Sequence, residues 1–325
     1  MRALIHRSFG DPADVLEIDE VDVPEPAAGQ VRVRMTLSPI HNHDLWTIRG
    51  TYGFVPDLPA RAGTEAVGVV DALGEGVEGL QVGQRVVTGG TFGVWAEYFV
   101  APARALIPVP DGISDEAAAQ LVSMPFSALS LIEYLGVEPG QWIVQNAANG
   151  AVGRLVAQLA AARGVRVLGL VRRAAGVAEL DDAGIADVVA TDAEGWRDRV
   201  REITGGAPIV AGVDSVGGAS AGEVASLLAE NGTLVVFGAM ASPTLEIPSG
   251  AVIFGQLTVK GFWGSKVSAA MDPAHRAALI GEVITRVADG SLALPVAAVH
   301  GFDDVAAAAR ANFEPGRVGK LLLRP

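Results

Sequence analysis

The first third of the chain contains short stretches in which apolar and polar residues alternate. Residues 31–35 alternate apolar and charged side chains, which is the pattern of a half-buried strand. Further strands are predicted at residues 66–73, 85–88 and 95–100, and glycine-rich turns such as Gly74-Glu75-Gly76 separate them. This part of the chain therefore predicts a small, β-rich, barrel-like unit.

The pattern changes near Ser114, which is followed by two acidic residues and predicts the start of a helix. Further along, strand patterns at residues 142–145, 166–171, 187–190, 209–214 and 233–238 alternate with helical ones. A long helix is predicted to end near Asp289, and a last strand to cover residues 319–323. Alternating strands and helices predict a parallel sheet with right-handed crossovers.

A glycine-rich turn lies between the first of these later strands and the helix that follows it. This is the context that a dinucleotide-binding turn requires, with Ala148 in the first glycine place. Gly150 would let the backbone approach a pyrophosphate, Gly153 would let the helix pack on the sheet, and the helix N-terminus would supply N–H groups. The predicted cofactor-binding residues here are Asn149, Gly150, Ala151, Val152 and Gly153. A tight turn without a ligand is the alternative.

The end of the next strand indicates which nicotinamide is used. It carries Arg172 and Arg173 where NAD-binding proteins usually carry an acidic residue. Guanidinium groups pair with a 2′-phosphate, whereas a carboxylate would repel it. The pair predicts NADPH, and the alternative is that both are ordinary surface arginines.

Length and composition narrow the class of protein. A chain of 325 residues suggests roughly two domains. Its net charge, 24 − 37 = −13, argues against a nucleic-acid partner. The absence of cysteine excludes disulfides, thiolate catalysis and cysteine-type zinc sites. No signal-peptide pattern and no apolar run of about 18 residues is present, so we expect a cytoplasmic protein that does not enter a membrane.

Several motifs together resemble the medium-chain dehydrogenase/reductase superfamily over nearly the whole chain. They are residues 63–68 (GTEAVG), 83–86 (GQRV), the Gly150 turn, residues 214–218 (DSVGG) and the Gly319-Lys320 tail. Thr64 stands where zinc-dependent members carry a histidine ligand, which implies a zinc-independent member without a metal.

This resemblance also implies an architecture. The expected fold class is α/β, with a GroES-like β-barrel catalytic domain at residues 1–116 and 268–325. A Rossmann domain with a doubly wound parallel sheet, which binds NADPH, is expected at residues 117–267. The resemblance further implies an active site in the cleft between the domains and a homodimer formed through the Rossmann domain.

Two subfamilies of this superfamily compete. Residues 49–53 (RGTYG), 58–60 (LPA), 145–150 (QNAANG) and 261–263 (GFW) resemble the 2-enoyl thioester reductases, and the likeness implies that Tyr52 is catalytic. The NADPH:quinone oxidoreductases share the overall pattern less closely. Further cofactor contacts are expected at Gly238, Ala239, Met240, Phe262, Trp263 and Gly264.

The segment before Tyr52 departs from the reductase pattern, because it reads Ile40-His41-Asn42-His43-Asp44. Asn42 and His43 join Tyr52 as catalytic candidates. His41 or His43 would serve as a proton relay. Alternatively, both would bind a residual metal with Glu65, since histidines two residues apart can face the same side of a strand. The interpretation that we favour is local hydrogen bonding, with Asp44 capping a helix that begins at Leu45.

The predicted reaction is reduction of an activated C=C bond in a 2-enoyl thioester or similar conjugated carbonyl by hydride transfer from NADPH. Tyr52 would polarise the carbonyl or donate a proton, or it would only pack its loop. Trp46, Phe54 and Phe92 are candidates for lining an apolar pocket, and the alternative is that they belong to the core. The alternatives are an NADPH:quinone oxidoreductase and, less expected, an NADPH-binding protein without turnover.

Overall fold

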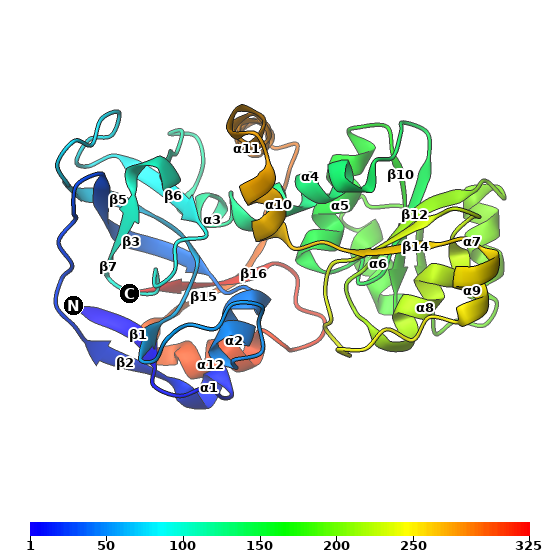
Figure 1. The fold of residues 1–325 in the computed structure, drawn as a ribbon, viewed down its shortest axis with the longest axis horizontal. Coiled ribbons are helices and arrows are strands. Elements are labelled where there is room, and N and C mark those ends of the chain that lie inside the picture. The colour runs from blue at the N-terminus through cyan, green and yellow to red at the C-terminus, as the bar shows by residue number, and fades with distance from the viewer. The chain divides into compact units, whose positions relative to one another are not determined.

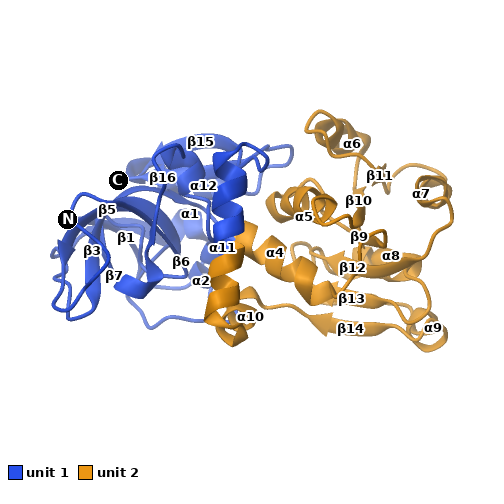
Figure 2. Ribbon diagram, turned by 90° about the horizontal axis from the view of Figure 1, so that it is seen from above, with its two compact units in different colours: residues 1–123, 280–325 blue, residues 124–279 orange.

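The computed structural model describes residues 1–325, which divide into two compact units. Unit 1 comprises residues 1–123 and 280–325, and unit 2 comprises residues 124–279 (Figure 2). The domain limits expected from the sequence, 1–116 with 268–325 and 117–267, stay a prediction, because compactness alone does not define a domain that folds independently.

Unit 1 is built mainly from antiparallel strands in two sheets (Figure 1). A three-stranded sheet has the order β2-β1-β4, and a seven-stranded sheet has the order β15-β16-β3-β5-β6-β8 with β7 paired to β3. Only β15 and β16 pair in parallel. The strands are β1 (Arg2–His6), β2 (Leu16–Glu20), β3 (Gln30–Pro39), β4 (Ala60–Arg61), β5 (Glu65–Leu73), β6 (Arg85–Gly89), β7 (Tyr98–Pro102), β8 (Ile107–Pro108), β15 (Val296–Gly301) and β16 (Lys320–Arg324).

A large hydrophobic core in unit 1 includes residues of both sheets. The alternation predicted for β3 is present, because Val31, Val33 and Met35 are buried in this core while Arg34 is exposed. Short helices close the unit: α1 (Pro12–Val15), α2 (Asn42–Ile48), α3 (Asp115–Ala118) and α12 (Val305–Ala311), with 3₁₀ turns at Ala103–Ala105 and Phe302–Asp304. Ser114 caps α3 as predicted, since its side chain accepts a hydrogen bond from the backbone N–H of Ala117.

The strand predicted at residues 95–100 begins later than expected, at Tyr98. Trp95 is fully buried, and its Nε1 donates to Ser38 Oγ at 2.9 Å. Its ring packs on Gly63, where an added Cβ would lie only 2.2 Å from Trp95 Cδ1. The chain therefore bends to bury this tryptophan before it pairs with β3.

Unit 2 contains a six-stranded sheet whose strands are all parallel. The order is β11-β10-β9-β12-β13-β14, so the direction of winding reverses between β9 and β12. Helices lie on both faces of the sheet (Figure 2). The strands are β9 (Trp142–Gln145), β10 (Arg166–Val171), β11 (Val188–Ala190), β12 (Ile209–Asp214), β13 (Thr233–Val236) and β14 (Thr258–Gly261). The predicted fold class, a β-rich unit with a doubly wound parallel sheet, is confirmed.

The helices of unit 2 include α5 (Ala151–Ala161), which follows the predicted glycine-rich turn. Its apolar stripe is buried, including Leu155, Val156 and Leu159. The other helices are α4 (Ser123–Leu135), α6 (Ala174–Asp181), α7 (Trp196–Thr204), α8 (Gly218–Leu227), α9 (Ser249–Phe254) and α10 (Gly264–Ala270). Helix α11 (Pro273–Ala288) contains the boundary between the two units, which lies after Leu279.

The strand predicted at residues 233–238 ends earlier, at Val236. The backbone N–H groups of Phe237 and Gly238 both donate to the carbonyl oxygen of Asp214, at 2.7 and 3.2 Å. These bonds turn the chain away from the sheet. Residues 238–240 therefore form a loop at the carboxyl end of β13.

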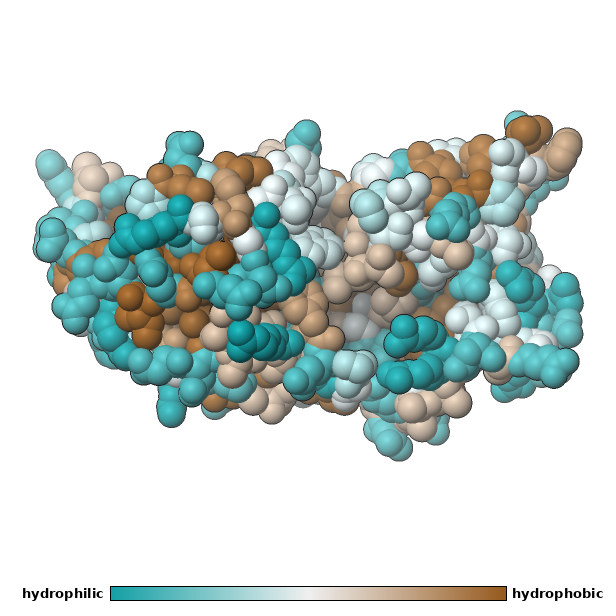
Figure 3. Space-filling model, turned by 90° about the horizontal axis from the view of Figure 1, so that it is seen from below, coloured by the Kyte–Doolittle hydropathy of each residue, from teal (hydrophilic) through white to brown (hydrophobic).

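The surface carries hydrophobic residues in separate patches between hydrophilic ones, on the face that Figure 3 shows. The most exposed large apolar side chain is Phe254, of which 82% is accessible. None of the helices is both long enough and apolar enough to cross a bilayer.

Candidate functional site

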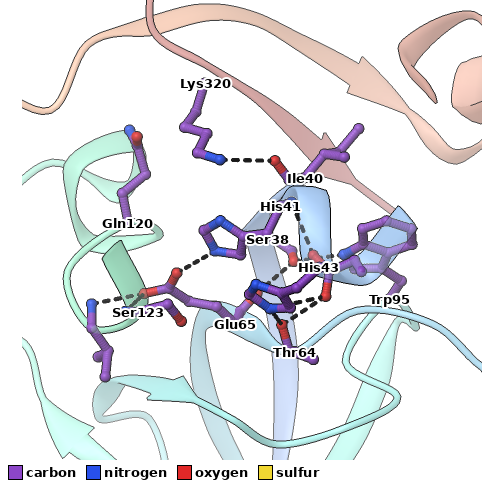
Figure 4. A network of polar contacts seen from close by, with 12 residues as sticks. Ser38, Ile40, His41, His43, Thr64, Glu65, Trp95, Gln120, Ser123 and Lys320 are labelled. Carbon is purple, nitrogen blue, oxygen red and sulfur yellow. Dashed lines mark hydrogen bonds and ion pairs between the residues drawn. The ribbon is translucent and has the colours of Figure 1, made fainter. Parts of the chain in front are cut away.

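A polar cluster in unit 1 joins the start of α2 to the start of β5 (Figure 4). It consists of His41, His43, Asp44, Thr64 and Glu65. His41 precedes the first residue of α2, and its backbone N–H donates to Asp44 Oδ2 at 2.9 Å. Asp44 therefore caps α2 from inside the first turn. The helix begins at Asn42 and not at Leu45, so this detail of the sequence interpretation was wrong.

His41 and Glu65 form a buried pair. His41 Nε2 lies 2.6 Å from Glu65 Oε2, and the side chains are 1% and 0% exposed. Glu65 Oε1 accepts the backbone N–H groups of Val122 and Ser123 at 2.7 and 2.8 Å. Burial raises the pKa of Glu65 to about 7, against the opposing effect of these two backbone donors. Burial also lowers the pKa of His41 well below its ordinary value, so the imidazole is neutral.

Lys320 on β16 lies beside this pair (Figure 4). Its Nζ donates to the carbonyl oxygen of Ile40 at 3.2 Å. Burial lowers the pKa of Lys320 to about 8, and the nearby charge of Arg317 acts in the same direction. The last strand thereby brings a cationic group to the start of α2, which the sequence did not indicate.

His43, Thr64 and Asp44 form a second chain of contacts in the polar cluster. Thr64 Oγ1 lies 2.7 Å from Asp44 Oδ1 and 2.7 Å from His43 Nε2. The rings of His41 and His43 are stacked, with centroids 4.9 Å apart and planes 17° apart. Local hydrogen bonding, the interpretation favoured from the sequence, describes these contacts.

The structure brings two of the three predicted catalytic side chains together. The ring of Tyr52, in the loop after α2, lies 5.9 Å from that of His43. Asn42 is adjacent in sequence, and its Oδ1 accepts a hydrogen bond from Asn312 Nδ2 at 2.8 Å. Asn312 follows α12 and was missed by sequence reasoning, because no local pattern links residues 270 positions apart.

The metal interpretation rested on two histidines on one face of a strand, and that premise is wrong. His41 and His43 lie at the start of α2, and both carboxylate oxygens of Glu65 are engaged in hydrogen bonds. No three histidine, aspartate or glutamate side chains in the chain are grouped so as to hold a metal ion.

A cavity of about 200 Å³ in unit 1 reaches the polar cluster. Asp44 and Thr64 line it, together with Phe54 and Phe92, whose ring centroids are 4.5 Å apart. Arg61 also lines this cavity. Of the three predicted pocket residues, Phe54 and Phe92 line this cavity, whereas Trp46 is half-buried on α2 and does not.

In unit 2, the predicted cofactor-binding residues follow the carboxyl ends of parallel strands. Gly150 is the N-cap of α5, and no side chain caps the free N–H groups of its first turn. An added Cβ at Gly153 would lie 2.7 Å from the carbonyl oxygens of Ala147 and Ala148. Ala147, not Ala148, has the positive φ of 48° in this turn. The backbone thus forms an open cradle of donors.

Arg172 and Arg173 lie at the carboxyl end of β10, the neighbour of β9 in the sheet. Both are exposed, and neither forms an ion pair with a residue of the chain. Their guanidinium groups remain available to an anionic ligand.

The remaining predicted cofactor contacts also lie at this edge of the sheet. Residues 238–240 follow β13, and residues 262–264 follow β14. Phe262 is 6% exposed and stacks on Phe237, with centroids 5.7 Å apart. A shallow hollow in unit 2 is lined by Phe262, Trp263 and Lys266.

Two polar residues to which the sequence analysis assigned no role form a hydrogen bond between β9 and β12, where the direction of winding reverses. Asn146 follows β9 and Asp214 ends β12, and Asn146 Nδ2 lies 2.5 Å from Asp214 Oδ1. Asn146 Oδ1 accepts the backbone N–H of Ser215 at 2.7 Å. The available signal was a polar residue at the end of each of two buried strands.

The chain is similar to known proteins in two family models and over nearly its full length in single relatives. A family model described as the alcohol dehydrogenase GroES-like domain matches residues 27–111, and one described as zinc-binding dehydrogenase matches residues 151–279. The human protein named mitochondrial enoyl-[acyl-carrier-protein] reductase is 33% identical over 329 residues, which cover 99% of this chain and 88% of that protein.

Solved structures of quinone oxidoreductases are also similar. That of Escherichia coli quinone oxidoreductase complexed with NADPH has a TM-score of 0.89 and 25% identity, and covers 100% of both chains. That of a Pseudomonas syringae quinone oxidoreductase has a TM-score of 0.89 and 26% identity, and covers 100% of this chain and 99% of that one.

Proposed function

Because the chain belongs to the medium-chain dehydrogenase/reductase superfamily and is an oxidoreductase, we propose that it reduces the activated C=C bond of a 2-enoyl thioester or similar conjugated carbonyl with NADPH. The observation that carries this proposal is the contact between Tyr52 and His43 in the polar cluster. Such a pair offers a hydrogen-bond donor and a proton carrier to one substrate. The likeness to enoyl reductases over nearly the whole chain supports the same substrate class.

The residues of unit 2 fit NADPH. The uncapped start of α5 offers backbone N–H groups to the pyrophosphate, because Gly150 and Gly153 leave no side chain there. Arg172 and Arg173 offer two unpaired guanidinium groups to the 2′-phosphate. When bound, the reduced nicotinamide supplies a hydride to the β-carbon of the conjugated alkene. The NADPH complex of the similar E. coli structure supports this choice.

Tyr52, Asn42 and His43 act on the substrate. Negative charge develops on the carbonyl oxygen as the alkene is reduced, and the Tyr52 hydroxyl stabilises it by donating a hydrogen bond. Asn42 assists, since Asn312 engages its carbonyl oxygen and orients the amide. His43 delivers the proton that the α-carbon requires.

The reaction proceeds without zinc in this proposal. The chain contains no cysteine, and Thr64 stands where the zinc-dependent members have histidine. Thr64 is instead bound to His43 and Asp44. Stabilisation of the enolate therefore falls to hydrogen-bond donors of the protein.

Reduction of a quinone is the second candidate. It is favoured by the similarity to two quinone oxidoreductase structures and by the net charge of −13, because a small uncharged quinone needs no basic surface. Both candidates use the same cofactor, and they differ only in the acceptor.

A homodimer is the proposed assembly. Strand β14 pairs only with β13, which leaves its outer edge open. On the neighbouring α9, Ile253 and Phe254 are 58% and 82% exposed. An open edge beside exposed apolar side chains favours pairing with another copy. The proposed location is the cytoplasm, although the human relative is named as a mitochondrial protein.

The test compares Tyr52→Phe with the wild-type protein, using NADPH and crotonyl-coenzyme A. Loss of the hydroxyl is expected to lower kcat by about 10²-fold or more, the range of an oxyanion donor. Tyr98→Phe is the matched control, because Tyr98 lies on β7 outside the polar cluster. Full turnover by Tyr52→Phe would exclude the catalytic role of this tyrosine.

A further inference from the structure

The hydroxyl of Thr64 has a single proton and two partners. Asp44 is buried, and its Oδ2 already accepts the backbone N–H of His41. Its Oδ1 lies 2.7 Å from Thr64 Oγ1. In this hydrogen bond the hydroxyl donates and the carboxyl oxygen accepts, so the Thr64 proton lies toward Asp44.

This assignment determines the tautomer of His43. Because the Thr64 proton is donated to Asp44, the hydroxyl oxygen can only accept from His43 Nε2, 2.7 Å away. In the opposite tautomer, Nε2 would carry a lone pair and no proton. That lone pair would then face the lone pairs of two oxygens, Thr64 Oγ1 at 2.7 Å and Asp44 Oδ1 at 3.5 Å, without a hydrogen bond to either. Neutral His43 therefore carries its proton on Nε2 and leaves Nδ1 bare.

We propose that Thr64 and Asp44 are positioning residues that hold His43 as the Nε2–H tautomer and so make Nδ1 the atom that carries and delivers the proton of the reaction. This inference rests on the proposed function. In the step, the Nδ1–H bond of the imidazolium breaks and its proton forms a C–H bond with the electron pair of the enolate α-carbon. His43 returns to the neutral Nε2–H form, and solvent supplies the next proton.

The charges around His43 fit this role. Oδ1 of the buried Asp44 lies 3.5 Å from His43 Nε2. The ring of Tyr52 faces His43 from the following loop. The stacked ring of His41 would oppose a second charge, but burial and the charge of Lys320 lower the pKa of His41 and keep it neutral.

The sequence does not indicate this role for Thr64, because its position is the one at which the superfamily's zinc-dependent members have a metal ligand. In this chain the Thr64 hydroxyl instead donates to the buried carboxylate of Asp44 and accepts from the imidazole of His43. The same logic, a carboxylate fixing the tautomer of a histidine, operates with direct contact in other enzymes.

The experiment compares Thr64→Val, Thr64→Ser and Thr88→Val in the full-length protein. Thr88 is a matched control, since it is fully buried on β6 and bonded to Thr91 outside the polar cluster. With NADPH and crotonyl-coenzyme A, Thr64→Val is expected to lower kcat by about tenfold or more and to change the KM for NADPH by less than about twofold. Thr64→Ser is expected to restore kcat, and Thr88→Val to retain it.

Nitrogen-15 NMR of the imidazole side chains reads the tautomer without turnover. The chain has five histidines, and His43→Gln identifies the signal of His43. Neutral His43 is expected to be protonated at Nε2 in the wild-type protein and to become a mixture of tautomers in Thr64→Val. Protonation at Nδ1 in the wild type, or full kcat in Thr64→Val, would overturn the inference. An inactive wild-type protein with His43 protonated at Nε2 would instead refute the proposed function and leave the tautomer assignment standing.

Discussion

Replacing Glu65 by glutamine should change how the stability of the protein depends on pH. The side chain is fully buried, and Oε1 accepts the backbone N–H groups of Val122 and Ser123. Glutamine keeps the shape and can keep this acceptor, so the variant is expected to fold. It removes the ionisation of the carboxyl group, whose pKa burial raises from 4.5 to about 7.

Because folding raises the pKa of Glu65, this carboxyl group makes the protein less stable as pH rises. The unfolded chain releases the Glu65 proton near the ordinary pKa, while the folded protein retains it up to about pH 7. Between these values the folded state binds more protons, so the free energy of unfolding falls as pH rises. The pKa difference, 7 − 4.5 = 2.5, corresponds to about 3 kcal/mol at about 1.36 kcal/mol per pKa unit. This stabilisation is present below about pH 4.5 and is lost by about pH 8.

Urea unfolding at several pH values between 5 and 8 measures the effect. The stability of the wild type minus that of Glu65→Gln is expected to fall by about 2–3 kcal/mol across this range. Because His41 stays neutral, it adds little to the difference. Glu78→Gln, in an exposed loop, controls for the loss of one carboxylate. A difference that is constant or rises with pH would mean that the hydrogen bonds to Glu65 outweigh its burial and that the pKa of the carboxyl group is not raised.

Three further predictions concern unit 2. Replacing Arg172 and Arg173 by alanine should raise the KM for NADPH by about 10- to 100-fold in steady-state kinetics, because the charge-assisted hydrogen bonds to the 2′-phosphate are lost. The KM for NADH, which has no 2′-phosphate, should stay almost unchanged. Gly153→Ala should lower the free energy of unfolding by about 1–3 kcal/mol and weaken NADPH binding in fluorescence titration, because the added Cβ would overlap two carbonyl oxygens. Gly281→Ala is the control, since an added Cβ meets open space there, and it should change neither property in this way. Phe254→Ser should shift the protein toward monomer in analytical ultracentrifugation if the exposed edge of unit 2 forms the dimer, and an unchanged mass would exclude that edge.

The sequence predicted the elements of unit 2 well because each is marked by local signals. Strand β10 covers the predicted residues 166–171, and α5 buries the predicted apolar stripe. The errors lie where tertiary contacts override the pattern. Trp95 turns into the core before β7 begins, and the Asp214 carbonyl ends β13 at Val236.

The candidate site was predictable only in part. The turn at Gly150 and the pair Arg172 and Arg173 were readable because their meaning depends on neighbours in sequence. The contacts of Lys320 and Asn312 could not be predicted, since both residues lie near the end of the chain and contact residues about 270–280 positions earlier. A local sequence pattern carries no information on contacts at that separation.

The most direct test of the proposed function is NADPH oxidation by the purified protein, with crotonyl-coenzyme A and a small quinone measured in parallel. We expect rapid turnover of the thioester and formation of the saturated acyl product, detected by mass spectrometry. Turnover of the quinone alone would exclude the enoyl reductase function and make the protein a quinone reductase, in which Tyr52 serves only as a residue of the pocket.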